Sequence, residues 1–236
     1  MKAPDEPIVK PVPIKGFVHR RAFYIPVDPP SRIIETTLKK KAARKRELPY
    51  GNFYQWDDTA VLTRSIGAPA SVMGLELLIA SGSEEIVILG FCGSLNPALS
   101  CLDVVSIRQA YSEEGTSDHY IRTKKIFSSS GPLRQRIEAD LAERNLPFSQ
   151  GVTVSTDAPF RETRSWLKDK QQKRIDVVDM EASAVFALGE HHGIPTAALM
   201  IVSDELGAKK WKNVFKYPRL NAQIKNYFIP FLEEKP

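Results

Sequence analysis

The chain has 236 residues, 42% of them hydrophobic and 26% charged, which is the composition of an ordinary globular protein with room for one α/β domain. Apolar runs such as residues 194–202 are too short to cross a bilayer, and the first residues lack the apolar core of a secretory signal. Two cysteines cannot form a disulfide framework, and the four histidines lack metal-ligand spacing. We therefore expect a cytoplasmic protein with no membrane segment and no metal.

The net charge of +5 is concentrated in one place, because six of the eight residues 39–46 are Lys or Arg. Such a run suits either a nucleic-acid or phosphate patch, or the solvated face of a helix or a mobile loop. We favour the solvated face or loop, because neither interleaved aromatic residues nor an RNA-binding signature accompanies the charges. Nucleic acid is therefore not the expected partner.

The first thirty residues hold seven of the seventeen prolines, which resist both helix and central strand. We predict that residues 1–20 form a Pro-rich extended arm and that residues 21–236 form the folded domain. A short strand is expected at residues 23–25. Ser31 is the predicted N-cap of a helix that runs to residue 46.

From residue 59 onwards, strands and helices alternate. The predicted strands are at 59–66, 85–89, 102–107, 152–155, 175–178 and 196–202. The predicted helices are at 69–81, 132–145, 181–192 and 220–232, and a further helix after the strand at 152–155 ends near residue 172. This alternation indicates parallel βαβ units and a sheet covered on both faces. Ligands gather at the carboxyl ends of strands in such sheets.

Three short segments follow strand ends, at Gly90–Gly93, Met180-Glu181 and Ser203-Asp204. The glycines suit an anion cradle or a tight turn, and the two acids suit chemistry or helix capping. Singly, none of the three decides between its two interpretations. No dinucleotide fingerprint and no Lys-Ser/Thr phosphate loop accompanies the glycines.

Together these segments are more specific. The run from Val177 through Met-Glu to Ala-Leu-Met-Ile-Val-Ser-Asp204 resembles the nucleoside phosphorylase superfamily, which includes purine nucleoside phosphorylases, uridine phosphorylases and methylthioadenosine nucleosidases. Ser65-Ile-Gly67-Ala-Pro69 is similar to the family's Gly-Ile-Gly turn. The loop holding Phe91, Cys92 and Gly93 is similar to its central glycine loop, and residues 154–163 are similar to its base-side loop.

The resemblance covers about residues 59–206 and implies a single α/β domain with a twisted, mixed central sheet flanked by helices. It also implies an enzyme of nucleoside metabolism, such as purine salvage, that cleaves an N-glycosidic bond. By analogy, Met180 packs against the sugar, Glu181 binds the ribose hydroxyls and Asp204 protonates the departing base. Phe160 either forms a wall for the base or belongs to the core. Asp204 suits a purine, because it can meet N7.

The chain departs from the phosphorylase pattern at two positions, since Ile88 and Phe91 stand where those enzymes carry an Arg and a hydroxyl. An Arg fork matches phosphate, and Ile cannot replace it. We therefore favour water over phosphate as acceptor, a hydrolase rather than a glycosyltransferase. A phosphorylase using Arg64 or Arg32, and a catalytically weakened nucleoside-binding protein, remain the alternatives.

No cofactor is expected, and inorganic phosphate is the one co-substrate left open. The resemblance also implies a homo-oligomer, because sites in this superfamily usually lie near subunit interfaces.

Overall fold

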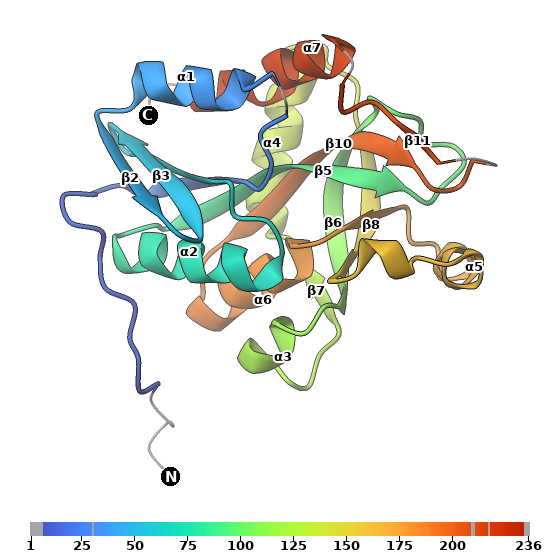
Figure 1. The fold of residues 1–236 in the computed structure, drawn as a ribbon, viewed down its shortest axis with the longest axis horizontal. Helices are drawn as coiled ribbons and strands as arrows, with labels where there is room; N and C mark the ends of the chain where they lie inside the picture. Colours follow the sequence, from blue (N-terminus) through green and yellow to red (C-terminus); the bar gives the residue numbers. More distant parts are fainter. Residues whose placement is uncertain (1–6, 30, 209–210, 217, 234–236) are drawn as a thin grey trace.

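The computed structural model describes residues 7–29, 31–208, 211–216 and 218–233. Its centre is one large mixed sheet (Figure 1). Within the described residues, the strands are β1 (Arg21–Ile25), β2 (Arg44–Leu48), β3 (Gly51–Trp56), β4 (Thr59–Thr63), β5 (Glu85–Ser94), β6 (Val104–Glu113), β7 (Ile126–Ser128), β8 (Ser149–Thr156), β9 (Val177–Asp179), β10 (Thr196–Glu205) and β11 (Lys212–Asn213).

Helices cover both faces of this sheet (Figure 1). They are α1 (Ile33–Lys41), α2 (Ala68–Ala80), α3 (Ser117–Tyr120), α4 (Gly131–Glu143), α5 (Arg164–Gln172), α6 (Ala182–His192), α7 (Pro218–Tyr227) and α8 (Ile229–Glu233), with a 3₁₀ turn at Pro159–Arg161. The α/β class, the mixed sheet and the flanking helices predicted from the sequence are confirmed.

Five strands close into a ring. Strand β5 pairs with β10, β10 with β6, β6 with β8, β8 with β9, and β9 again with β5. The remaining large strands, β1, β4, β3 and β2, extend the sheet outward from β5. The ring contains the three strands that precede the candidate site, so it holds their carboxyl ends close together.

Alternation along the central strands separates two cores. On one face, α2 and α6 pack against side chains such as Tyr24 and Ile88. On the other face, α1, α4, α7 and α8 pack against side chains such as Phe23 and Val87. Neighbouring strand residues point to opposite faces, so the continuous apolar runs of β1 and β5 are what a sheet covered on both sides requires.

The basic segment 39–46 differs from its prediction as one helix. Helix α1 ends at Lys41, and Ala42 takes an extended conformation. Strand β2 then begins at Arg44 and pairs antiparallel with β3. The ladder of backbone hydrogen bonds to β3 outweighs the helix propensity of the Lys and Arg side chains, and the sequence reading missed this hairpin.

The start of α1 also differs from its prediction. The N-cap is Arg32, in a left-handed conformation, rather than Ser31. The carboxylate of Asp28 caps the helix instead, because it accepts hydrogen bonds from the backbone N–H groups of Ile34 and Glu35. Residues 7–20 contain no helix or strand, and they contribute Ile14 and Phe17 to the core.

Candidate active site

The central glycine segment lies where β5 changes partners. Up to Ile88 the strand pairs with β1, and from Gly93 it pairs with β9. A Cβ on Gly93 would lie 2.6 Å from Cδ1 of Leu206 and 3.3 Å from Oδ2 of Asp204. A side chain at position 93 would therefore clash with Leu206 and crowd the Asp204 carboxylate, so a glycine suits the close approach of β10 to β5.

Cys92, the neighbour of Gly93, is buried inside the ring. Burial, together with the negative charges of Asp179 and Asp204, raises the pKa of its thiol. Both acids therefore act on one buried atom, although they are 25 positions apart in the chain. The ring has brought the ends of β9 and β10 to the same place.

Glu181 occupies the turn between β9 and α6 and is almost completely buried. Its Oε1 accepts a 2.7 Å hydrogen bond from the backbone N–H of Gly67, in the turn before α2. Burial and the nearby charge of Asp179 raise the pKa of Glu181 to about 8. The backbone N–H groups of Gly67 and Met180 both act on this carboxyl, and a carboxyl with two donors still has lone pairs to offer a ligand.

Asp179 holds this turn in place through hydrogen bonds. Its carboxylate accepts hydrogen bonds from the hydroxyls of Thr153 (2.6 Å) and Ser155 (2.8 Å) and from the backbone N–H groups of Glu181 (2.7 Å) and Ala182 (2.8 Å). Burial raises the pKa of Asp179, and these four donors oppose that effect. The sequence reading missed this residue, which positions Glu181 rather than facing a ligand.

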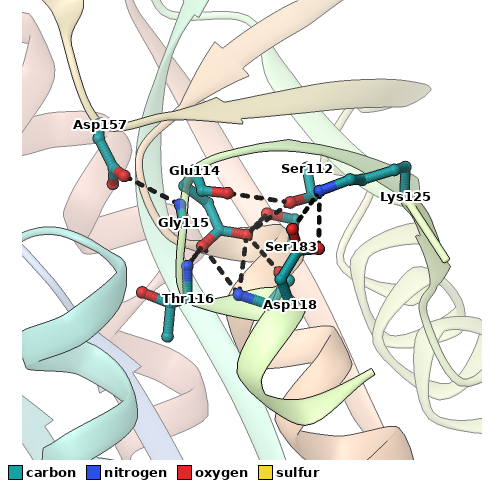
Figure 2. Close-up of polar contacts among 9 residues, drawn as sticks. Ser112, Glu114, Gly115, Thr116, Asp118, Lys125, Asp157 and Ser183 are labelled. Carbon is teal, nitrogen blue, oxygen red and sulfur yellow. Dashed lines mark hydrogen bonds and ion pairs between the residues drawn. The ribbon is translucent and has the colours of Figure 1, made fainter. Parts of the chain in front are cut away.

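A second buried carboxylate, that of Glu114, stabilises the first turn of α6 (Figure 2). Glu114 accepts hydrogen bonds from the hydroxyls of Ser112, Ser117 and Ser183 and from the backbone N–H groups of Thr116 and Ser117. Burial alone would raise the pKa of Glu114, but these donors bring it below its ordinary value. Ser183 lies two positions after Glu181, so this network fixes the helix end that carries the site.

Asp204 follows an irregularity in the pairing of β10 with β5, where the register shifts between Val202 and Asp204. Such a bulge turns a side chain out of the regular alternation. Oδ1 of Asp204 accepts a hydrogen bond from the Ser203 hydroxyl, and Oδ2 accepts one from the indole N–H of Trp211, both at 2.8 Å.

A pocket of about 380 Å³ opens at Asp204. Two aromatic side chains line it: Phe160, which is fully exposed, and Trp211. Glu162 adds a second carboxyl to the lining. Trp211 and Glu162 were not singled out from the sequence, because neither belongs to a strand end or a periodic pattern. The pocket has the size and aromatic walls of a site for a flat heterocycle.

A second pocket, of about 410 Å³, lies beside the Gly67 turn. Arg32 and Arg64 both line it, and both have left-handed backbone conformations. The carboxylates of Asp28 and Glu35 share the pocket, so its charge is mixed.

The predicted site residues separate into two groups. Gly93 pairs with both Val178 and Asp204, Cys92 lies next to it, and Phe160 shares a pocket with Asp204. Glu181 follows β9 and contacts the Gly67 turn, outside the lining of that pocket. Met180 is half-buried beside Glu181. The Phe91 ring instead contacts Phe228 in the opposite core, with ring centroids 5.8 Å apart, and it does not line the pocket of Arg32 and Arg64.

Within the described ranges, no group of three metal-binding side chains comes together. In the same part of the chain, none of the helices has the length and apolar character needed to span a membrane.

Comparison with known proteins gives consistent matches. A family model, the phosphorylase superfamily, matches residues 35–226. A guanosine phosphorylase of Halorubrum lacusprofundi is 28% identical over 216 residues, covering 90% of this chain and 89% of that protein. An uncharacterized protein of Acanthamoeba polyphaga mimivirus is 29% identical over 158 residues, covering 65% of this chain and 60% of that protein.

Two solved structures share the fold. A purine nucleoside phosphorylase of Toxoplasma gondii, in complex with immucillin-H, has a TM-score of 0.74 and 23% identity, with 89% of this chain and 87% of that chain covered. A 5'-methylthioadenosine/S-adenosyl homocysteine nucleosidase of Campylobacter jejuni has a TM-score of 0.74 and 18% identity, with 89% and 96% covered.

Proposed function

Because the chain belongs to the phosphorylase superfamily, as its sequence resemblance predicted, we propose that it cleaves the N-glycosidic bond of a nucleoside, with purine nucleosides favoured. The observation that carries the proposal is that β9, which leads into Glu181, and β10, which carries Asp204, both pair with β5 at Gly93, with an aromatic pocket beside Asp204. A phosphorylase and a nucleosidase with this fold support the two possible reactions.

The sugar belongs beside Glu181. Its carboxyl keeps acceptor capacity after the Gly67 hydrogen bond, and two adjacent hydroxyls are the matching donors. Met180 would cover the apolar side of the sugar. Holding the ribose in this way orients the C1' atom toward the acceptor, a contribution made before any bond breaks.

The base belongs between Phe160 and Trp211, next to Asp204. As the bond to C1' breaks, negative charge accumulates on the leaving base, and a proton from a positioned acid relieves it. General acid catalysis of this kind typically contributes ~10²–10⁴-fold.

We favour water as the acceptor of the sugar. Ile88 and Phe91 have apolar side chains, so neither provides the charge or hydroxyl that anchors phosphate. Ile88 is buried in the core, and the Phe91 ring contacts Phe228. Phosphorolysis is the second candidate, and the pocket that Arg32 and Arg64 share supports it. Two guanidinium groups suit a phosphate, whereas the carboxylates of Asp28 and Glu35 oppose one.

The test is base release from a panel of nucleosides, with and without millimolar phosphate, followed by identification of the sugar product. Free ribose in both conditions supports hydrolysis, and ribose 1-phosphate supports phosphorolysis through the arginine pocket. Binding of nucleosides without any base release would identify a catalytically weakened binding protein. Glu181→Ala, which removes the sugar contact, is expected to abolish release, and Glu143→Ala on the exposed face of α4 is the matched control.

We also propose a homo-oligomer. An apolar groove of about 1130 Å³ supports it, because the proline-rich segment and α2 meet there and leave the apolar side chains of Val9, Val12 and Met73 exposed. Exposed apolar side chains that lie together mark association surfaces. Sedimentation equilibrium at micromolar concentration should give a mass above 26.5 kDa, and a species of only that mass would refute the proposal.

A further inference from the structure

The segment of residues 7–19 leads into β1 and ends at a buried histidine, His19. Every residue from 7 to 18 is exposed except Ile14 and Phe17, which pack into the core beneath α2. Residues 7 and 9–12 form one wall of the apolar groove at α2. The attachment of this segment to the body of the protein therefore decides whether the groove keeps that wall.

The loop between α2 and β5 holds this segment through two serine hydroxyls. The backbone N–H of Ile14 donates to the Ser81 hydroxyl, and Nε2 of His19 shares a hydrogen bond with the Ser83 hydroxyl, both at 2.8 Å. The two bonds lie at the two ends of the buried stretch 14–19. The His19 side chain is therefore one of the groups that attach the segment.

The surroundings of His19 suit a neutral imidazole. The residue is 2% exposed, and the Phe17 ring meets the imidazole edge-on, with ring centroids 6.5 Å apart. Nδ1 is buried and has no hydrogen-bond partner among residues 7–29, 31–208, 211–216 and 218–233. A protonated imidazole carries an N–H at both nitrogens, so protonation would leave a buried, charged donor at Nδ1 without an acceptor.

The charged groups around His19 do not offset this cost. Asp58, in the turn between β3 and β4, is the carboxylate whose charge favours the protonated imidazole. The nearby carboxylate of Glu84 is paired with Arg20 at 2.7 Å, and from β2 the guanidinium of Arg44 lies beside the segment and adds a positive charge. Burial outweighs the attraction of Asp58 and lowers the pKa of His19 to about 4.

We propose that His19 is an acid-sensitive latch, whose protonation releases residues 7–18 from the body and removes one wall of the apolar groove. In the released segment the imidazole takes up its proton at the ordinary pKa of about 6.5, and in the attached segment it does so at about 4. Attachment is therefore complete above pH 6.5 and weakens as the pH falls toward about 4. The inference concerns the groove and is independent of the proposed nucleoside cleavage.

Amide hydrogen exchange measured by NMR tests the proposal. The N–H of Ile14 is protected by its bond to Ser81, and the N–H of Phe17 by its 2.9 Å bond to the Ile14 carbonyl. After correction for the intrinsic effect of pH on exchange, the protection of both should fall ~10²-fold between pH 7 and pH 4, because the two pKa values of His19 differ by that factor. The amides of β5 should stay more strongly protected, because the core does not open with the segment.

Two histidine variants locate the titrating group. His19→Asn keeps a polar amide that can bond to Ser83 but takes up no proton in this range, so the protection of Ile14 should depend little on pH. His119→Asn is the matched control, because His119 is exposed on α3 and lines the same groove, and it should behave like the parent. Loss of the pH dependence in His119→Asn and its retention in His19→Asn would overturn the proposal.

The titration of His19 itself gives a readout that requires no variant to fold. Its imidazole ¹H–¹⁵N resonance in the parent protein is identified by its contact with the Phe17 ring. A midpoint near 4 is expected, and a midpoint near 6.5 would overturn the proposal. Exchange of Ile14 and Phe17 at the same rate as β5 would overturn it as well, because the segment would then be released only when the whole chain unfolds.

Discussion

The network around Glu114 predicts an unusually large effect of one substitution on stability. Glu114→Ala removes an acceptor that serves five donors, namely three hydroxyls and the backbone N–H groups of Thr116 and Ser117 (Figure 2). The hydroxyls can rotate toward other acceptors, but the two N–H groups are fixed by the start of α3. A buried donor left without a partner costs ~1–3 kcal/mol, so the two together cost about 2–6 kcal/mol.

A loss near the middle of that range is a large part of the total stability of a typical domain, which is ~5–15 kcal/mol. Urea unfolding followed by circular dichroism at pH 7 measures the loss. Glu143→Ala removes an exposed carboxylate and should change the free energy of unfolding by less than about 0.5 kcal/mol. A Glu114→Ala variant within about 1 kcal/mol of the parent would show that the network contributes little.

The same network predicts a dependence on pH. The folded pKa of Glu114 lies below its unfolded value, so its contribution is complete above the unfolded pKa of about 4.3 and is lost as the pH falls through the folded pKa. Over that acidic window, the parent should lose more stability than Glu114→Ala does. Parallel curves for the two proteins would contradict the assignment.

Three further outcomes are expected. Gly93→Ala places a methyl group against Leu206 and should lower the free energy of unfolding by about 1–3 kcal/mol, as thermal melts would report; a parental melt would mean that Leu206 yields freely. Burial raises the pKa of both thiols, that of Cys101 to about 11, so a thiol reagent at pH 7.5 should react fast only after unfolding, and rapid labelling of native protein would refute this. Trp211→Phe removes a donor to Asp204 and should weaken nucleoside binding without unfolding the chain; calorimetric titration showing parental affinity would exclude that role.

Elements whose structure follows from a local sequence pattern could be predicted from the sequence. Strand β5 and helix α6 appear close to their predicted positions, because a continuous apolar run and a long helical segment each fix one type of element. The three strand ends predicted the parts of the candidate site for the same reason. The strand ends meet because the five strands close into a ring. The ring includes the antiparallel pairings of β6 with β10 and of β9 with β5, which an alternation of strands and helices does not predict.

Other features have no local signal at all. Trp211 and Glu162 reach the pocket from loops, where the chain direction depends on tertiary contacts. Asp179 and Glu114 gather donors from several elements, so their roles become visible only when those elements are assembled. The helix expected through residue 46 ends at Lys41, because the backbone of residues 44–48 pairs with β3, the strand that follows directly after β2.

Strand β2 ends the sheet on the side away from the ring, and a free strand edge attracts other strands. Its exposed side chains are Arg44, Lys45, Arg46 and Glu47, which together carry a net positive charge, so two copies brought edge to edge would repel each other. The basic segment thus protects the chain from joining its sheet to that of a neighbour and from aggregating along that edge. A second copy is therefore expected to approach through the apolar groove at α2 and not by extending the sheet.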